Sequence, residues 1–504
     1  MTRAAHTVVL GGGTAGAAVA GLLAQKTDLS VLLVEAGPDY GPPERWPGEL
    51  LDAGRMPIGS HDWGYADTTS YPGRRVELNR ARVLGGCSAI NGCGVIWGHR
   101  SDYDGWAALG NPGWGADAML PVLRRASERL RGALGRLEDL SPYHRMFLES
   151  ARAVGVPTLE DLNDLDSGEG AGVAMVNIVD GTRWNTALAY LEPVRGRKNL
   201  EVLDRTLVDR LLLRGGRAYG VELIRAGERL TVHAERFVLC GGAYGSPAIL
   251  LRSGVGEPAE LEAAGVRPLH ALPGVGQNLQ DHPEIDMVFA GSPELSRQMH
   301  AHRASPGAKA KAAFAKLRSG VSEAAFDLHL YPDQILREGA WVWNYGISAQ
   351  VSRSRGYLRI DSPDPEAAPR IHHGYLSDPQ GHDLAVLANG YERLLELLRS
   401  GPLAGHLGGA QGEWAELRSR AELEALIRRV AQHTWHPVGT CRMGPAADPA
   451  AVADPAGRVH GLENLYLADA SLMPVITKGN TNLPTLAIAE KVAEGLIGSA
   501  GKEQ

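Results

Sequence analysis

The stretch Thr7-Val8-Val9-Leu10-Gly11-Gly12-Gly13-Thr14-Ala15-Gly16 predicts a short apolar strand that runs into a glycine-rich turn. The following residues predict a helix over 17–25 and a second buried strand over 31–34, with Glu35 at the end of that strand. A G-x-G-x-x-G pattern alone is weak evidence. Here it follows a strand, opens a helix and precedes an acid 19 positions after its third glycine. This context predicts a Rossmann-like dinucleotide-binding unit. The alternative, a glycine-rich turn in an ordinary α/β protein, would not require the helix and the acid at these positions.

Each part of this unit has a physical role. Gly11 permits the tight turn, Gly13 lets backbone amides approach a pyrophosphate, and Gly16 lets the helix pack closely on the strand. The pyrophosphate would rest on the helix N-terminus, and Glu35 would accept hydrogen bonds from a ribose diol. These residues leave open which dinucleotide binds.

Length, charge and cysteine content narrow the class of protein. A chain of 504 residues exceeds one typical core, so two or more lobes are expected. The net charge of −7 gives no general reason to expect nucleic acid as a partner. No stretch approaches the length of a membrane-spanning helix, and the N-terminus leads into the first strand without room for a signal peptide. The chain contains the cysteines Cys87, Cys93, Cys240 and Cys441. Their number and spacing predict neither a disulfide framework nor a zinc site, and they fit a reducing cytoplasm.

The middle of the chain has a different character from its ends. Residues 325–331 and 340–351 alternate like antiparallel strands, and Trp341, Trp343 and Tyr345 share one face. That face is either a substrate-side wall or the core of the sheet itself. An amphipathic helix is predicted from 118 to about 137.

The segment 297–318 carries cations with no acid between them. Such a segment can dock a membrane surface or an acidic partner, although a solvated helix or a mobile lid is the more frequent role. Its cations are Arg297, Arg303, Lys309, Lys311, Lys316 and Arg318.

Five blocks of sequence, in order, carry a resemblance to a known family. They are Gly11 to Glu35, 82–92 (RVLGGCSAING), 241–247 (GGAYGSP), 273–282 (PGVGQNLQDH) and a C-terminal pair, 435–444 (WHPVGTCRMG) with 480–485 (NTNLPT). The chain resembles the glucose-methanol-choline (GMC) family of FAD-dependent oxidoreductases across essentially its whole length. It is most similar to the branch of choline dehydrogenases and of aryl-alcohol or hydroxymethylfurfural oxidases.

The resemblance implies an α/β (α+β) fold, with a Rossmann-like FAD-binding domain and an inserted substrate domain built on an antiparallel sheet. The bounds that we predict are 1–155, 195–285 and 430–504 for the discontinuous FAD-binding domain, and 156–194 and 286–429 for the substrate-binding domain.

The resemblance also assigns the cofactor. Some relatives attach FAD covalently through a histidine two positions after the serine of the 82–92 loop, and that position is Ile90 here, so we expect non-covalent FAD. The residues that the resemblance and the glycine unit assign to FAD are Gly11, Gly13, Thr14, Ala15, Gly16, Glu35, Ala36, Arg82, Val83, Gly86, Ser88, Asn91, Gly92, Cys93, Val208, Asp469, Ala470, Asn482 and Leu483.

The activity implied is oxidation of a primary or secondary alcohol to the carbonyl. The hydride would pass to flavin N5, and the electrons to oxygen, a quinone or an acceptor protein. An alcohol with a pKa of roughly 16 facing a histidine near 6.5 is mismatched by about 13 kcal/mol in water. The site must therefore stabilise developing oxyanion charge with preorganised donors. The family positions for this work are His436 as base and Asn480, where many relatives carry a second histidine.

Other roles follow less directly. Trp435 and Trp343 are candidate walls of the substrate pocket and favour an apolar or aromatic primary alcohol, and His282 is expected to be structural. The sequence shows no constellation of acids that would clearly bind a quaternary ammonium. The alternative function is a lyase that keeps the fold and flavin but cleaves cyanohydrins without net redox chemistry.

Overall fold

The computed structural model describes residues 2–71, 73–304 and 312–503. The glycine unit folds as the sequence predicts. Strand β1 (Thr2–Leu10) pairs in parallel with β2 (Val31–Val34) on one side and with β13 (Glu228–Leu239) on the other. Helix α1 (Thr14–Lys26) begins directly after the glycine turn. The mixed helix-and-sheet fold class is therefore confirmed.

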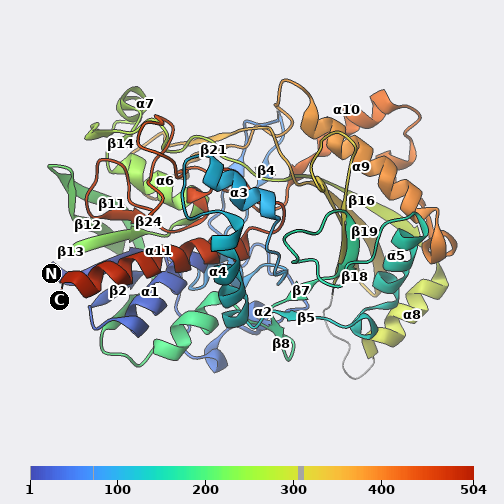
Figure 1. Ribbon diagram of the computed structural model, residues 1–504, viewed down its shortest axis with the longest axis horizontal. Helices are drawn as coiled ribbons and strands as arrows, with labels where there is room; N and C mark the ends of the chain where they lie inside the picture. The colour runs from blue at the N-terminus through green and yellow to red at the C-terminus, as the bar shows by residue number, and fades with distance from the viewer. Residues whose placement is uncertain (1, 72, 305–311, 504) are drawn as a thin grey trace.

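The first sheet joins both ends of the chain. Its strands follow the order β10-β2-β1-β13-β12-β11, and β24 also pairs with β13. Figure 1 places α1 and α11 side by side along this sheet, with both termini at the same end. The further elements of this layer are β10 (Leu200–Leu203), β11 (Thr206–Arg214), β12 (Arg217–Arg225), β24 (Leu465–Leu467), α6 (Gly242–Arg252) and α11 (Asn482–Glu503).

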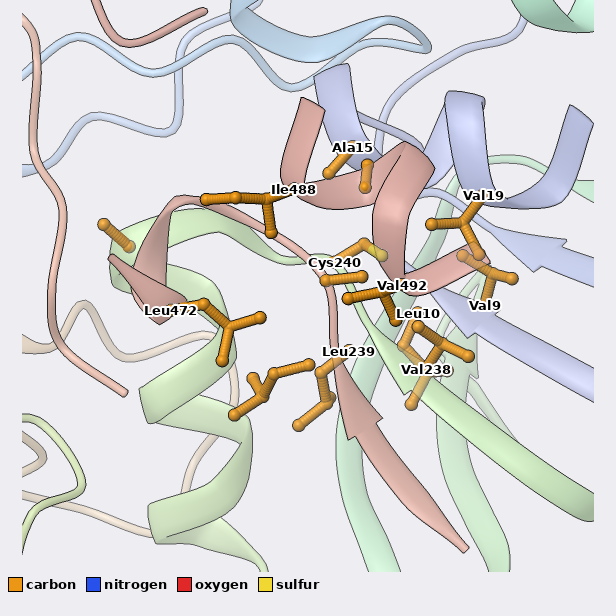
Figure 2. Packing of buried hydrophobic residues seen from close by; sticks show 14 of the residues in the cluster. Val9, Leu10, Ala15, Val19, Val238, Leu239, Cys240, Leu472, Ile488 and Val492 are labelled. Carbon is orange, nitrogen blue, oxygen red and sulfur yellow. The ribbon is translucent and has the colours of Figure 1, made fainter. Parts of the chain in front are cut away.

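The core under α1 and α11 consists of small and branched apolar side chains, which allow both helices to approach the strands closely. Figure 2 shows this packing around Val9, Leu10, Ala15, Val19, Val238, Leu239, Cys240, Leu472, Ile488 and Val492.

A second, antiparallel sheet fills the other half of the molecule (Figure 1). Its order is β22-β16-β19-β18-β17-β6, with β23 beside β16, so the predicted antiparallel sheet is confirmed. The strands are β6 (Gly170–Val173), β16 (Pro283–Gly291), β17 (Ala313–Leu317), β18 (Leu328–Arg337), β19 (Ala340–Ala349), β22 (Leu407–Ala410) and β23 (Gln432–His433), and the helices that pack on it are α5 (Pro142–Ala153), α8 (Pro293–Ala304), α9 (His382–Leu398) and α10 (Arg420–Val430).

The remaining helices and strands lie outside the two large sheets. Among them, a small sheet in the order β20-β21-β3-β4 joins residues 357–372 with residues 66–77. These elements are α2 (Gly48–Leu51), β3 (Ala66–Asp67), β4 (Val76–Glu77), α3 (Arg100–Ala108), α4 (Ala116–Arg129), β5 (Ala133–Leu134), β7 (Met175–Val176), β8 (Ile178–Val179), β9 (Thr182–Arg183), β14 (Val255–Gly256), α7 (Pro258–Ala263), β15 (His270–Ala271), β20 (Tyr357–Arg359) and β21 (Arg370–His372).

Two boundaries differ from the sequence expectation. The helix predicted to run to about 137 ends at Arg129, because Arg131 adopts the left-handed conformation (φ 54°) and Gly132 turns the chain into β5. The second of the paired strands starts where predicted, whereas the first, expected over 325–331, runs from Leu328 to Arg337. The pattern identified a strand there but not its limits.

The two hydrophobic cores differ from the predicted domain bounds at two places. Side chains of α5, such as Tyr143 and Phe147, belong to the core of the second sheet, although the predicted bound at 155 groups them with the first domain. Conversely, Leu188 and Leu191 pack in the core of the first sheet. The exact domain bounds stay a prediction, and the cores show that α5 packs with the second sheet.

The basic segment does not form one continuous exposed face. Lys316 is 1% exposed and its Nζ donates to Leu162 O, while Arg297 forms an ion pair with Glu294. Lys309 and Lys311 lie outside the described residues. Within the described part of the chain, no helix combines the length and the apolar character needed to cross a membrane.

The close approach of α1 to the glycine turn can be tested by adding one methyl group. A Cβ at Gly16 would lie 1.8 Å from Gly11 O, a distance that real atoms cannot share. We expect Gly16→Ala to reduce the free energy of unfolding by about 3 kcal/mol, as overpacked cores do. The matched control is Gly495→Ala in α11, where a Cβ meets nothing within 4 Å and helix propensity favours alanine. Equal urea midpoints for the two variants would contradict the assigned contact.

Candidate active site

A cavity of about 1910 Å³ extends from the glycine turn to the second sheet. Its wall includes Gly11 and Glu35 at one end and Asn344 of β19 at the other. His436 and Asn480 also line it. The dinucleotide unit and the proposed catalytic residues therefore open into the same space.

The glycine turn leaves room for backbone amides to face the cavity. Gly11 adopts φ 105°, and a Cβ there would lie 2.5 Å from Cys240 O. Gly13 occupies the N-cap of α1 without any side-chain cap, so the helix N-terminus is free to meet a phosphate. Across from it, a Cβ at Gly86 would lie 2.7 Å from Gly13 Cα. A side chain at Gly11 or Gly86 would press into the surrounding backbone, and the bare turn fits a pyrophosphate.

Glu35 closes the other side of this turn. Its two carboxylate oxygens accept from Gly12 N at 2.8 Å and Gly37 N at 2.7 Å. Burial raises the pKa of this carboxyl to about 7, even though both backbone bonds and Arg82 oppose the rise. Glu35 lines the cavity, and each carboxylate oxygen can accept one more hydrogen bond, which suits the hydroxyl groups of a ribose.

Most residues that the sequence assigned to FAD line this cavity. They are Gly11, Gly13, Thr14, Ala15, Glu35, Ala36, Arg82, Gly86, Asn91, Gly92, Val208, Asp469, Ala470 and Asn482.

Five predicted cofactor residues lie behind the cavity wall instead. Gly16 packs against the glycine turn, and Ser88 donates to Gly85 O at 2.6 Å and lies beside Thr186. Val83, Cys93 and Leu483 are fully buried. These five residues do not line the cavity, and their assignment to FAD stays a prediction.

His436 and Asn480, 44 residues apart in sequence, meet at the cavity. Asn480 Nδ2 lies 3.1 Å from His436 Nε2, and His282 Nδ1 lies 3.1 Å from His436 Nδ1. An amide nitrogen only donates, so Nε2 accepts and the hydrogen-bond network assigns the ring proton to Nδ1, which donates to His282. His282 was expected to be structural, but it orients His436. No motif or spacing predicted this contact, because the two histidines are 154 positions apart in the chain.

The backbone around His436 is held from two sides. Both Nη1 and Nη2 of Arg80 donate to Trp435 O at 3.1 Å, and His436 N donates to Asp281 Oδ1 at 3.0 Å. Trp435 itself adopts the left-handed region, with φ 60°, which is a strained conformation for a bulky residue. Arg80 and Asp281, which sequence reasoning did not single out as site residues, thus fix where the imidazole points.

Burial sets the protonation state of this group. Desolvation lowers the pKa of His436 well below its usual value, and the neighbouring His282 and Arg80 lower it further. The imidazole is therefore neutral near pH 7 and can accept a proton at Nε2. Burial also raises the pKa of Asp281 to about 6, although Arg80 and backbone hydrogen bonds oppose this.

Of the two tryptophans predicted to line the substrate pocket, only Trp435 lines the cavity. Trp435 lines the cavity beside His436. Trp343 does not line it, because that side chain is 2% exposed and packs with Tyr143 and Tyr345 in the core of the second sheet. The wall prediction for Trp343 is wrong, and the alternative interpretation of this face, the core of the sheet, holds for Trp343 and Tyr345.

Comparison with known proteins identifies the family. Two GMC oxidoreductase family models match the chain, over residues 5–284 and 352–489. Mitochondrial choline dehydrogenase of Mus musculus is 33% identical over 543 residues, covering 98% of this chain and 90% of the relative. Oxygen-dependent choline dehydrogenase 1 of Chromohalobacter salexigens is 34% identical, covering 97% of this chain and 94% of the relative.

Solved structures match the fold of this chain over nearly its whole length. Pyridoxine 4-oxidase from Mesorbium loti has a TM-score of 0.86 at 30% identity and covers 97% of this chain and 99% of its own. Formate oxidase, at a TM-score of 0.88 but 22% identity, covering 100% of this chain and 99% of its own, shows the fold alone. The chain belongs to the GMC oxidoreductase family. It is an FAD-dependent enzyme that oxidises alcohols.

The raised pKa of Glu35 predicts how the flavin-free protein responds to pH. The folded-state pKa of about 7 exceeds the unfolded value of 4.5, so the folded state binds the proton more tightly. The contribution of Glu35 to the free energy of unfolding is fully present below pH 4.5. It is lost as the pH rises through 7, and the loss amounts to about 3 kcal/mol. We expect Glu35→Gln to remove this part of the slope in urea titrations from pH 5 to 8. Parallel slopes for wild type and variant would contradict the assigned pKa.

Proposed function

We propose that His436 takes the hydroxyl proton of the alcohol while Asn480 holds the same oxygen. The observation that carries this proposal is the 3.1 Å contact between Asn480 Nδ2 and His436 Nε2 at the cavity wall. It supports a neutral, correctly oriented base whose accepting nitrogen lies beside a hydrogen-bond donor. Both groups can then engage one substrate oxygen.

The proton movement follows from this arrangement. An alcohol oxygen that replaces the direct contact would accept from Asn480 Nδ2 and donate its proton to His436 Nε2. The resulting imidazolium still donates its Nδ1–H to His282 Nδ1. Asn480 cannot exchange protons near neutral pH, so it would stabilise the developing oxyanion as a fixed hydrogen-bond donor.

The cofactor has a place beside this pair. FAD, when bound, supplies the hydride acceptor that alcohol oxidation requires. The amides at Gly11 and Gly13 would meet its pyrophosphate, and Glu35 would meet its ribose. Ile90 lines the cavity and carries no group that could bond to the flavin, which supports non-covalent FAD.

The electron acceptor and the location of the protein form the second part of the proposal. We propose oxygen as the electron acceptor, because the relative from Chromohalobacter salexigens is oxygen-dependent. A quinone or an acceptor protein is the alternative. We propose a cytoplasmic location from the cysteine content, which suits a reducing compartment. Peripheral membrane contact through 297–318 has less support, because Lys316 is buried and Arg297 is paired. No comparison favours the lyase alternative.

The role of His436 can be tested with the yellow holoenzyme under anaerobic conditions. We expect His436→Ala to retain bound FAD and to reduce the rate of flavin bleaching by an alcohol by about 10² or more, since general-base catalysis contributes that much. The measurement is stopped-flow absorbance of the flavin band. The matched control is His300→Ala, an exposed histidine on α8, which should bleach at the wild-type rate. Wild-type bleaching in His436→Ala would remove this residue from the mechanism.

The non-covalent attachment of FAD has a separate test. Because Ile90 stands at the position of the linking histidine, acid precipitation should leave all yellow colour in the supernatant and a colourless pellet. The supernatant should contain intact FAD by mass spectrometry. A pellet that stays yellow after washing in denaturant would show a covalent bond elsewhere.

A further inference from the structure

The donor of the catalytic pair lies in an irregular part of the chain. Residues 473–481, all of them described, form bends and loops between the short helix η8 (Ala470–Leu472) and α11. Their backbone groups therefore need partners from other elements. Asn480 reaches His436 from the far end of this segment. The contacts that hold the segment thus decide where Asn480 Nδ2 lies.

Neutral hydrogen bonds hold the start of the segment. The side chain of Gln280 donates from Nε2 to Pro474 O at 3.1 Å and accepts at Oε1 from Ile476 N at 3.2 Å. Trp106 Nε1 donates to Val475 O at 2.8 Å. These bonds leave the far end of the segment, which carries the catalytic donor, to other contacts.

A buried ion pair holds that far end. Lys478, two positions before Asn480, donates from its backbone N to Asp102 Oδ2 at 2.9 Å and from Nζ to Asp102 Oδ1 at 2.5 Å. Its Nζ also donates to Ser101 Oγ at 2.8 Å. The side chains of Lys478 and Asp102 are only 10% and 4% exposed. One carboxylate therefore holds both the main chain and the side chain of the same residue.

Helix α3 (Arg100–Ala108) fixes this carboxylate in turn. Asp102 lies in its first turn, and Oδ2 also accepts from the backbone N of His99, the N-cap residue, at 2.8 Å. Gly98 leaves room for the contact, since a Cβ there would lie 2.9 Å from Asp102 Oδ2. Trp106 of the same helix is fully buried. The position of α3 is therefore passed on to the segment through Asp102.

Close packing continues from the ion pair to the catalytic donor. Gly479 is the single residue between Lys478 and Asn480, and a Cβ at this position would lie 2.5 Å from Ile96 Cγ2. The side chain of Asn480 lies over Gly94, where a Cβ would meet Oδ1 at 3.6 Å. A shift of the backbone at Lys478 would therefore reach Asn480 directly.

We propose that the buried ion pair of Lys478 with Asp102 positions Asn480 for catalysis. This inference rests on the role of Asn480 proposed above and adds the residues that hold this donor in place. Neither Lys478 nor Asp102 is among the described residues that line the cavity, so both act through Asn480. Charge-assisted hydrogen bonds are shorter and stronger than neutral ones, which suits a group that must hold its place. A displacement of about 1 Å near the reacting atoms can cost about 10²-fold in rate.

The first test removes the ammonium group from the holoenzyme. Anaerobic flavin bleaching is measured by stopped flow with benzyl alcohol, 1-butanol and choline, each over a range of concentrations. We expect Lys478→Met to lower the limiting rate of bleaching by about 10-fold or more with the best of these alcohols. The half-saturating concentration should change by less than about 2-fold, because Asn480 is proposed to act mainly on the developing oxyanion.

A double-mutant cycle separates positioning from a general defect. In the Asn480→Ala background, Lys478→Met should lower the limiting rate by less than about 2-fold, since the group that it positions is already absent. A structural defect that acts elsewhere in the cavity would lower the rate by the same factor in both backgrounds.

Two further variants serve as controls. Lys478→Met leaves the carboxylate of Asp102 buried without its partner, which can impair folding. The double variant Asp102→Asn/Lys478→Met removes both charges and should show the same loss of limiting rate with normal FAD content. The matched control is Lys316→Met, which removes another buried lysine, one that donates to Leu162 O and Ser167 Oγ. It should keep the wild-type limiting rate.

The outcomes distinguish this inference from the proposed function. A wild-type limiting rate in Asp102→Asn/Lys478→Met, or an equal loss with and without Asn480, would overturn the positioning role while alcohol oxidation stands. A wild-type rate in Asn480→Ala would overturn the proposed role of Asn480. Failure of every alcohol to bleach the wild-type flavin would overturn the proposed function itself.

Discussion

The hydrogen bond between Asn480 Nδ2 and His436 Nε2 determines what the cavity can do. An amide nitrogen can only donate, so it selects the tautomer in which Nε2 is unprotonated and accepts from Asn480. The Nδ1–H group on the opposite side of the ring then donates to His282 Nδ1. Because burial keeps the imidazole neutral, one geometric relation supplies an available base and a donor for the oxygen that the base deprotonates.

The same contact depends on the glycine turn at the start of the chain. Asn480 lies just before α11, whose first residue, Asn482, accepts from Thr14 Oγ1 at 3.2 Å. Helix α11 packs along α1, and α1 can lie so near β1 only because Gly16 has no side chain. The turn that would hold a pyrophosphate therefore also positions the donor of the catalytic pair. Cofactor binding and catalysis share one packing constraint.

The sequence alone predicted the local features and not the long-range ones. Strand, turn, helix and acid around Glu35 could be predicted because each depends on neighbours along the chain. His436 and Asn480 were found through the resemblance, since spacing alone cannot bring together residues 44 positions apart. The period-2 pattern placed Trp343 on one face of a strand, but no pattern says which face meets the cavity.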